Sequence, residues 1–210
     1  MNKFLFVTMI SGLPLLGYSS TADVLMAPTH EDIKRQDEFK SKGYIETYQE
    51  YAKYLLDLQK AKDKKHFFKS QYFEDKIFDK FEQISLMSSI RPTEALHELK
   101  SFGISGMGSY TDNGWNGYRI YFEGKNKEMC SFSYMSLNST DGCVFLDTVT
   151  SSHKVKDMDA TYMVEGDKVS GYLYSINWYS KDTVSMLDCA LSYYSPKEIV
   201  HLNKLAEDLS

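Results

Sequence analysis

The sequence predicts an α+β fold: an N-terminal helical hairpin and a short helix packed on an antiparallel meander sheet of about six strands, followed by a C-terminal helix. Three features of the 210 residues support this prediction. Apolar residues recur every three or four positions in residues 23–102, alternate with polar residues in 103–195, and return to helical spacing in 196–210. Because the period changes from helical to extended only once, the pattern favours separate helical and sheet parts over repeated βαβ units.

The first 22 residues have the three parts of a cleavable secretory signal peptide. Lys3 supplies the positive start, residues 4–16 are mostly apolar, and Ser20-Thr21-Ala22 places small side chains before the expected cleavage point. The apolar stretch is shorter than the roughly 20 residues that a membrane span requires. We therefore expect residues 23–210 to form a single α+β domain, exported to the periplasm or the extracellular space, with no membrane span after cleavage.

The helical part is expected to contain a two-helix hairpin and a short third helix over residues 95–99. Thr29 and Asp32 have the spacing of a helix start, and Gly43 is expected to interrupt the helix that follows. Two apolar seams predict the arms of the hairpin, and the polar residues 60–65 separate them. The first seam consists of Tyr44, Tyr48, Tyr51, Leu55 and Leu58, and the second of Phe73, Ile77, Phe81 and Ile84.

The sheet part is expected to be a meander whose strands follow one another through short turns. Alternation of apolar and polar residues predicts strands over residues 118–123, 130–134, 143–150, 160–165, 168–179 and 184–194. Phe122 is expected to face Cys130 across a turn at residues 124–127. Gly166-Asp167 is a strong signal for a two-residue hairpin turn.

Three cysteines follow the predicted signal peptide, namely Cys130, Cys143 and Cys189. In an oxidising compartment two of them are expected to pair. A hairpin that turns near Thr140 would hold Cys130 and Cys143 more than about 20 Å apart, because strands rise ~3.3 Å per residue. We favour a disulfide between Cys143 and Cys189, with Cys130 either free or the alternative partner. Asp188 alternates with Cys189 and is expected on a solvated face.

The loop over residues 110–117 is the strongest candidate for a binding site. It gathers two aromatic rings, a carboxylate and two amides beside a predicted strand, and loops on rigid scaffolds often carry recognition. The candidate binding residues are Tyr110, Asp112, Asn113, Trp115 and Asn116. The alternative is an ordinary turn in which Trp115 folds onto the core.

No motif in the sequence predicts catalysis, a metal site or a cofactor. The five histidines are scattered singly, without the spacing of metal ligands. The glycines between residues 103 and 108 match neither the nucleophile-elbow nor the dinucleotide-binding pattern, and we interpret them as a turn from the third helix into the sheet. The net charge of −5 makes nucleic acid a poor partner.

These observations predict an exported, non-catalytic module that binds another protein, such as a periplasmic inhibitor or an immunity-type protein. Acidic inhibitors of this kind are steered toward basic partners. Two alternatives stay open at this point. One is a structural adaptor of the cell envelope that docks through the helical hairpin. The other is a secreted hydrolase whose catalytic residues converge only in the fold.

Overall fold

The structure is a computed structural model that describes residues 29–64, 66–67, 77–137 and 153–210. Its elements follow in the order α1 (His30–Lys42), β1 (Ile45–Glu46), α2 (Glu50–Lys60), η1 (Phe81–Gln83), α4 (Glu94–His97), β2 (Ser101–Thr111), β3 (Gly114–Glu123), β4 (Met129–Ser136), β5 (His153–Val155), β6 (Met158–Asp167), β7 (Gly171–Tyr179), β8 (Thr183–Leu191) and α5 (Pro196–Leu209). The predicted α+β fold class and the C-terminal helix are confirmed.

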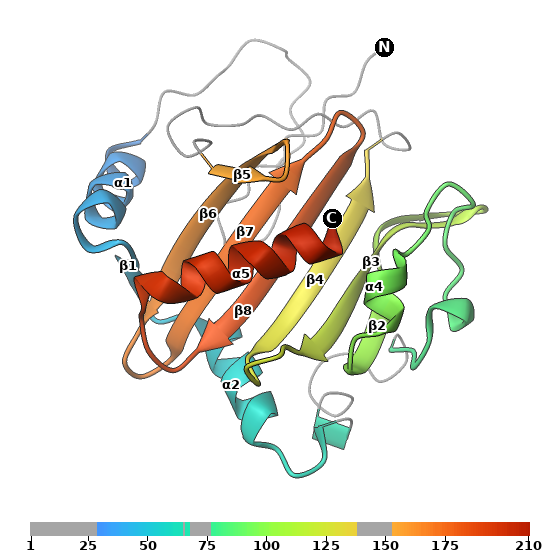
Figure 1. Ribbon diagram of the computed structural model, residues 1–210, viewed down its shortest axis with the longest axis horizontal. Coiled ribbons are helices and arrows are strands. Elements are labelled where there is room, and N and C mark those ends of the chain that lie inside the picture. Colours follow the sequence, from blue (N-terminus) through green and yellow to red (C-terminus); the bar gives the residue numbers. More distant parts are fainter. Residues whose placement is uncertain (1–28, 65, 68–76, 138–152) are drawn as a thin grey trace.

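Within the described residues, eight strands form one mostly antiparallel sheet (Figure 1). Strands β2, β3 and β4 make one meander, and β6, β7 and β8 make another, with β5 paired to β6. The two meanders meet where β4 pairs antiparallel with β8, in a register from Met129↔Ala190 to Ser136↔Thr183. The short β1 is the exception, because it runs parallel to β6. The centre of the sheet is therefore a seam between two segments that lie far apart in the sequence.

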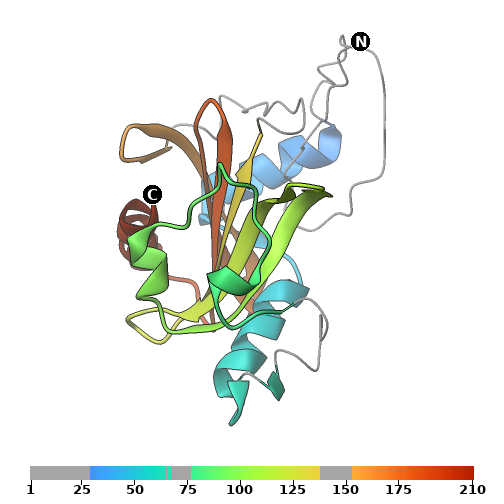
Figure 2. The ribbon, with the colours of Figure 1, turned by 90° about the vertical axis from the view of Figure 1, so that its right-hand side faces the viewer.

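Helices lie on both sides of this sheet. Figure 2 shows α4 and α5 on one side and α2 on the other, and we call the two surfaces of the sheet the α5 face and the α2 face. On the α5 face, Leu202 and Ala206 join the larger apolar cluster, whereas Leu55 and Leu58 of α2 belong to a smaller cluster on the other face. In the part of the chain that the structure describes, no helix is long and apolar enough to span a bilayer.

The first helix begins and ends where the sequence predicts. Thr29 caps α1, because its side chain accepts a hydrogen bond from the Asp32 backbone while the Asp32 carboxylate accepts one from the Thr29 backbone. Gly43 ends the helix with a φ of 78°, a left-handed conformation that glycine adopts without steric cost. Arg35 of α1 pairs with Glu165 of β6, and this ion pair ties the helix to the sheet.

The predicted second arm of the helical hairpin is wrong over its described part, residues 77–84. Phe78 instead bridges Ile104 of β2 in an antiparallel arrangement, with both backbone hydrogen bonds formed, and Phe81 begins the short 3-10 helix η1. The helical spacing of these apolar residues does not reflect one helix face, because they pack in different places. Phe81 packs edge-on against Tyr118, whereas Ile77 joins the α2 cluster. Residues 68–76 of this predicted arm lie outside the described residues.

Two predicted turns are also corrected. The glycines between residues 103 and 108 lie within β2, an edge strand that lacks a clear alternation. Gly166 and Asp167 end β6, and the turn follows at residues 168–170, because the Asp167 carboxylate accepts hydrogen bonds from the backbones of Val169 and Ser170.

The expected pairing of Phe122 with Cys130 is confirmed. The predicted strand over residues 143–150 lies outside the described residues.

Candidate functional site

The five candidate binding residues lie in the hairpin that joins β2 to β3. The hairpin turns through Asp112 and Asn113, and Thr111 pairs with Gly114 across the turn. Figure 1 shows this hairpin projecting sideways from the edge of the sheet. The segment predicted as a loop is therefore the tip of two strands, and its geometry is set by the ladder behind it.

Tyr110 and Trp115 form an aromatic pair at this tip. Tyr110 is 62% exposed, and its ring meets the Trp115 ring edge-on with 5.2 Å between the centroids. Trp115 is only partly exposed and packs on Gly106, where a Cβ atom would lie 2.4 Å from the indole ring. The backbone N–H of Trp115 donates to the Ser85 carbonyl at 2.8 Å, and the backbone carbonyl of Trp115 accepts from the Met87 N–H at 3.0 Å. The backbone hydrogen bonds thus hold Trp115 in position, and the Tyr110 ring packs against the Trp115 ring while it remains largely exposed to solvent.

The other three candidates divide between the surface and the interior. Asp112 and Asn113 are exposed at the turn, where the Asn113 N–H donates to the Thr111 hydroxyl. Asn116 is fully buried. Its Oδ1 accepts from the Ser109 N–H at 2.6 Å, and its Nδ2 donates to the Ser136 carbonyl at 3.0 Å. Asn116 therefore holds the hairpin to the end of β4 and does not reach the surface that a partner would contact.

The structure corrects the predicted disulfide. Cys130 bonds Cys189, with 4.1 Å between the two Cα atoms. These residues are direct register partners on β4 and β8, so the bond crosses the seam between the two meanders. The sequence favours a bond between Cys143 and Cys189 and leaves Cys130 as the alternative partner, because local alternation does not determine which distant strand pairs with β4. Cys143 lies outside the described residues.

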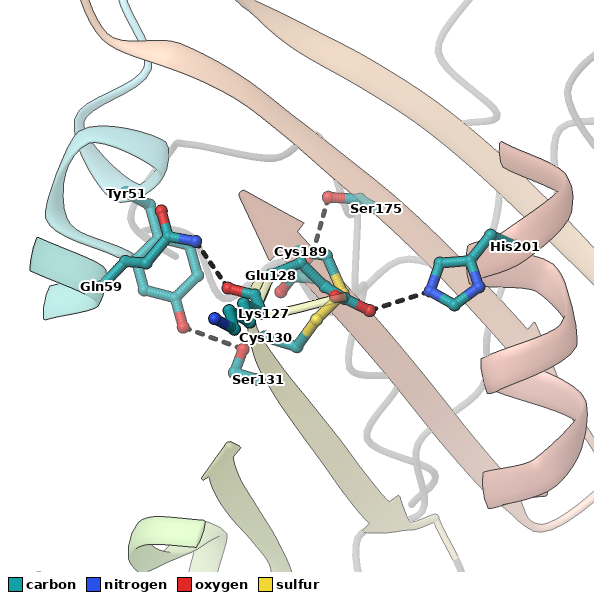
Figure 3. The surroundings of a disulfide bond; sticks show 10 residues. Tyr51, Gln59, Lys127, Glu128, Cys130, Ser131, Ser175, Cys189 and His201 are labelled. Carbon is teal, nitrogen blue, oxygen red and sulfur yellow. Dashed lines mark hydrogen bonds and ion pairs between the residues drawn. A yellow bond between two sulfur atoms is a disulfide. The ribbon is translucent and has the colours of Figure 1, made fainter. Parts of the chain in front are cut away.

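Both sides of the disulfide carry polar contacts (Figure 3). Glu128, which is 2% exposed, meets Nε2 of His201 on α5 at 2.9 Å. On the α2 face, the Tyr51 hydroxyl donates to Ser131 Oγ at 2.9 Å. Burial raises the pKa of Tyr51 well above its ordinary value, so this hydroxyl remains a donor at neutral pH.

The α2 face of the central strands carries a polar group that the sequence reasoning missed. It consists of Arg119, Ser131, Ser133, Ser175 and Asp188. The Ser175 hydroxyl donates to the Asp188 carboxylate at 2.6 Å, and burial raises the pKa of Asp188. The expectation that Asp188 lies on a solvated face is therefore wrong, because the residue is partly buried. The sequence did contain a signal for this polar group. Along their strands, the polar residues alternate with Tyr118, Phe132 and Leu187, which face α5.

Among the described residues, no group of three or more His, Cys, Asp or Glu side chains is arranged to hold a metal ion. Comparison of the chain with family models, curated proteins and solved structures finds no match. The functional argument therefore depends on the geometry of the described residues.

Proposed function

We propose that the protein is an exported, non-catalytic module of the inhibitor or immunity type, which binds another protein through the tip of the β2–β3 hairpin. The observation that carries this proposal is Tyr110, a largely exposed aromatic side chain whose ring packs against the partly buried Trp115. Tyrosine and tryptophan are enriched among the residues that dominate binding energy at protein interfaces.

Rigidity is what distinguishes this tip from a flexible loop with the same composition. The backbone of Trp115 is hydrogen-bonded to residues 85 and 87, and Asn116 fixes the strands behind the turn. A partner that contacts Tyr110 would therefore order few additional groups, which lowers the entropic cost of binding. Asp112 adds a carboxylate at the turn, and the net charge of −5 favours approach to a basic surface.

Two further features support the exported location. The predicted signal peptide would direct the chain out of the cytoplasm. The Cys130–Cys189 disulfide is of a kind that persists in oxidising compartments and is rare where thiols are kept reduced. The adaptor alternative relied on a helical hairpin whose second arm is not α-helical in residues 77–84, so we do not propose it.

The test is an affinity purification from an envelope extract of the native cells, followed by measurement of the affinity for the protein that is captured. Three forms are compared: the unchanged chain, Tyr110→Ala, and Tyr48→Ala as a matched control. Tyr48 is also largely exposed, at 58%, but it lies on a different part of the surface. We expect Tyr110→Ala to weaken binding by about tenfold or more, as loss of an interface anchor does, and Tyr48→Ala to leave it unchanged.

Two results would contradict the proposal. One is a captured protein whose affinity is the same for all three forms. The other is turnover of peptidoglycan or of a model ester by the purified chain, since this would favour the hydrolase alternative.

A further inference from the structure

One end of the molecule carries a group of exposed lysines, although the chain as a whole is acidic. This end is built by the C-terminus of α2 and by the turn between β3 and β4. The Gln59 side chain of α2 donates to the Lys127 carbonyl at 2.5 Å, so the two segments are in direct contact (Figure 3). Next to this contact, Leu58 of α2 and Met129 of β4 are fully buried in the same apolar cluster. The packing therefore holds the lysines of both segments at one end of the fold.

Four lysines at this end form a surface that we call the lysine patch. The patch consists of Lys60, Lys62, Lys125 and Lys127. All four are exposed, and within the part of the chain that the structure describes, none has a carboxylate oxygen within 4.0 Å. Because each side chain ends in an ammonium group, the patch presents four uncompensated positive charges to solvent.

The carboxylates near the patch do not neutralise it. Glu123 pairs with Lys100 at 3.5 Å, and the buried Glu128 meets His201. Asp63 is the only acidic residue between positions 59 and 64. At 0.1 M salt, exposed charges act over a distance of only about 10 Å. The acidic residues on the rest of the molecule are therefore screened, and a partner at this end meets a positive surface.

Stabilisation of the helix end accounts for only part of this charge. Lys60 lies in the last turn of α2, where a cation compensates the helix dipole, and the Lys64 ammonium donates to the Gln59 carbonyl at 2.8 Å. Lys127 belongs to the β3–β4 turn and has a φ of 68°, a left-handed conformation that favours glycine or asparagine. The turn thus holds a lysine where its backbone favours another residue, and this points to a role for the charge itself.

We propose that the lysine patch binds the surface of a bilayer that contains anionic phospholipids. Clusters of lysines are attracted to such surfaces, and each lysine close to the headgroups raises the partitioning of a protein about fivefold. A protein partner fits this surface less well, because lysine is depleted at protein interfaces, which favour aromatic residues and arginine. The patch is separate from the tip of the β2–β3 hairpin, so this binding does not depend on what the tip contacts.

Cosedimentation with lipid vesicles tests the proposal. The purified protein is mixed with vesicles of phosphatidylcholine and phosphatidylglycerol in a ratio of about 7:3, or with vesicles of phosphatidylcholine alone. We expect the protein to sediment with the anionic vesicles more than with the neutral ones at about 50 mM NaCl. Raising the salt to about 0.5 M should remove this difference, because salt shortens the range of the attraction.

Two double variants that lose the same charge separate the patch from the net charge of the chain. Lys125→Gln with Lys127→Gln removes half of the patch and should lower the partition coefficient on anionic vesicles by about twentyfold. Lys34→Gln with Lys40→Gln removes two exposed lysines of α1, which lies away from the patch (Figure 1), and should leave the coefficient unchanged.

A third double variant, Lys60→Gln with Lys62→Gln, removes the other half of the patch and provides the test if the turn variant does not fold. Three results would overturn the proposal: equal sedimentation with both kinds of vesicle, an equal loss from the patch and α1 variants, or binding to immobilised polyglutamate without binding to the anionic vesicles. The last result would favour an acidic protein as the partner. Tyr110→Ala should bind the vesicles like the unchanged chain, so failure of this proposal and failure of the hairpin proposal can be told apart.

Discussion

At the scale of single residues, Asn116 shows how a residue type common in binding loops can instead hold the scaffold together. It lies among the five candidates that composition selected, yet its side chain is buried between two backbone groups. The sequence predicted where the candidates lie, because Trp, Tyr, Asp and Asn gather in one segment. It did not separate the exposed Tyr110 from the buried Asn116, since the two residues lie on opposite strands of a hairpin whose register shifts between Met107 and Tyr110.

We predict that Asn116→Ala destabilises the protein, whereas Tyr110→Ala does not. Loss of the amide leaves the buried Ser136 carbonyl without its partner, and an unsatisfied buried group costs about 1–3 kcal/mol; the Ser109 N–H, on an exposed residue, loses its partner as well. Urea unfolding followed by circular dichroism measures both variants. Equal free energies of unfolding for Asn116→Ala and the unchanged chain would show that the amide is not structural.

The base of the hairpin tip gives a second prediction. Gly106→Ala places a methyl group 2.4 Å from the Trp115 ring, so the ring must move and Tyr110 must move with it. We expect a weaker affinity for the captured partner and a changed tryptophan fluorescence spectrum. If the affinity stays the same although the fluorescence changes, the position of Trp115 does not matter for binding.

At the scale of elements, the disulfide is the feature that links the two meanders. Local alternation predicted β3, β4, β6, β7 and β8, because each strand packs one row of apolar side chains under a helix. It missed the edge strand β2, whose residues include Gly103, Gly106 and Gly108, and the very short β1 and β5. It also could not predict the pairing of β4 with β8, which depends on contacts between residues 59 positions apart at the disulfide.

We predict that the double variant Cys130→Ala, Cys189→Ala lowers the free energy of unfolding by about 4 kcal/mol, because the bond closes a long loop in the unfolded chain. Urea unfolding of the oxidised protein and of the variant measures this difference. Peptide mapping without reduction should join the peptides that contain Cys130 and Cys189. A map that joins Cys189 to Cys143 would contradict the pairing described above.

At the scale of the whole molecule, buried tyrosines make the fold sensitive to alkali. Burial raises the pKa of Tyr174 to about 12, and it also raises the pKa of Tyr118 and Tyr51 above the ordinary value of 10.0. The unfolded chain releases these protons near pH 10, whereas the folded chain retains them. The free energy of unfolding should therefore fall as the pH rises from 10 to 12, and full stability should be present below pH 10.

Urea titrations at pH 8, 10 and 11 measure this dependence. Each group whose pKa is raised contributes a slope of up to about 1.4 kcal/mol per pH unit within its window. Tyr174→Phe should reduce the slope, although it also removes the hydrogen bond from the Ser195 N–H. A free energy of unfolding that does not change across this range would contradict the assigned pKa shifts.

The central claim is that the tip of the β2–β3 hairpin contacts another protein after export. Site-specific photo-crosslinking in living cells tests it most directly, with a photoreactive phenylalanine analogue in place of Tyr110 in one strain and of Tyr48 in another. Both positions are largely exposed, so both analogues can react with a neighbouring protein. We predict a discrete crosslinked product, outside the cytoplasm, from position 110 and none from position 48. No product from position 110, or the same product from both positions, would contradict the claim.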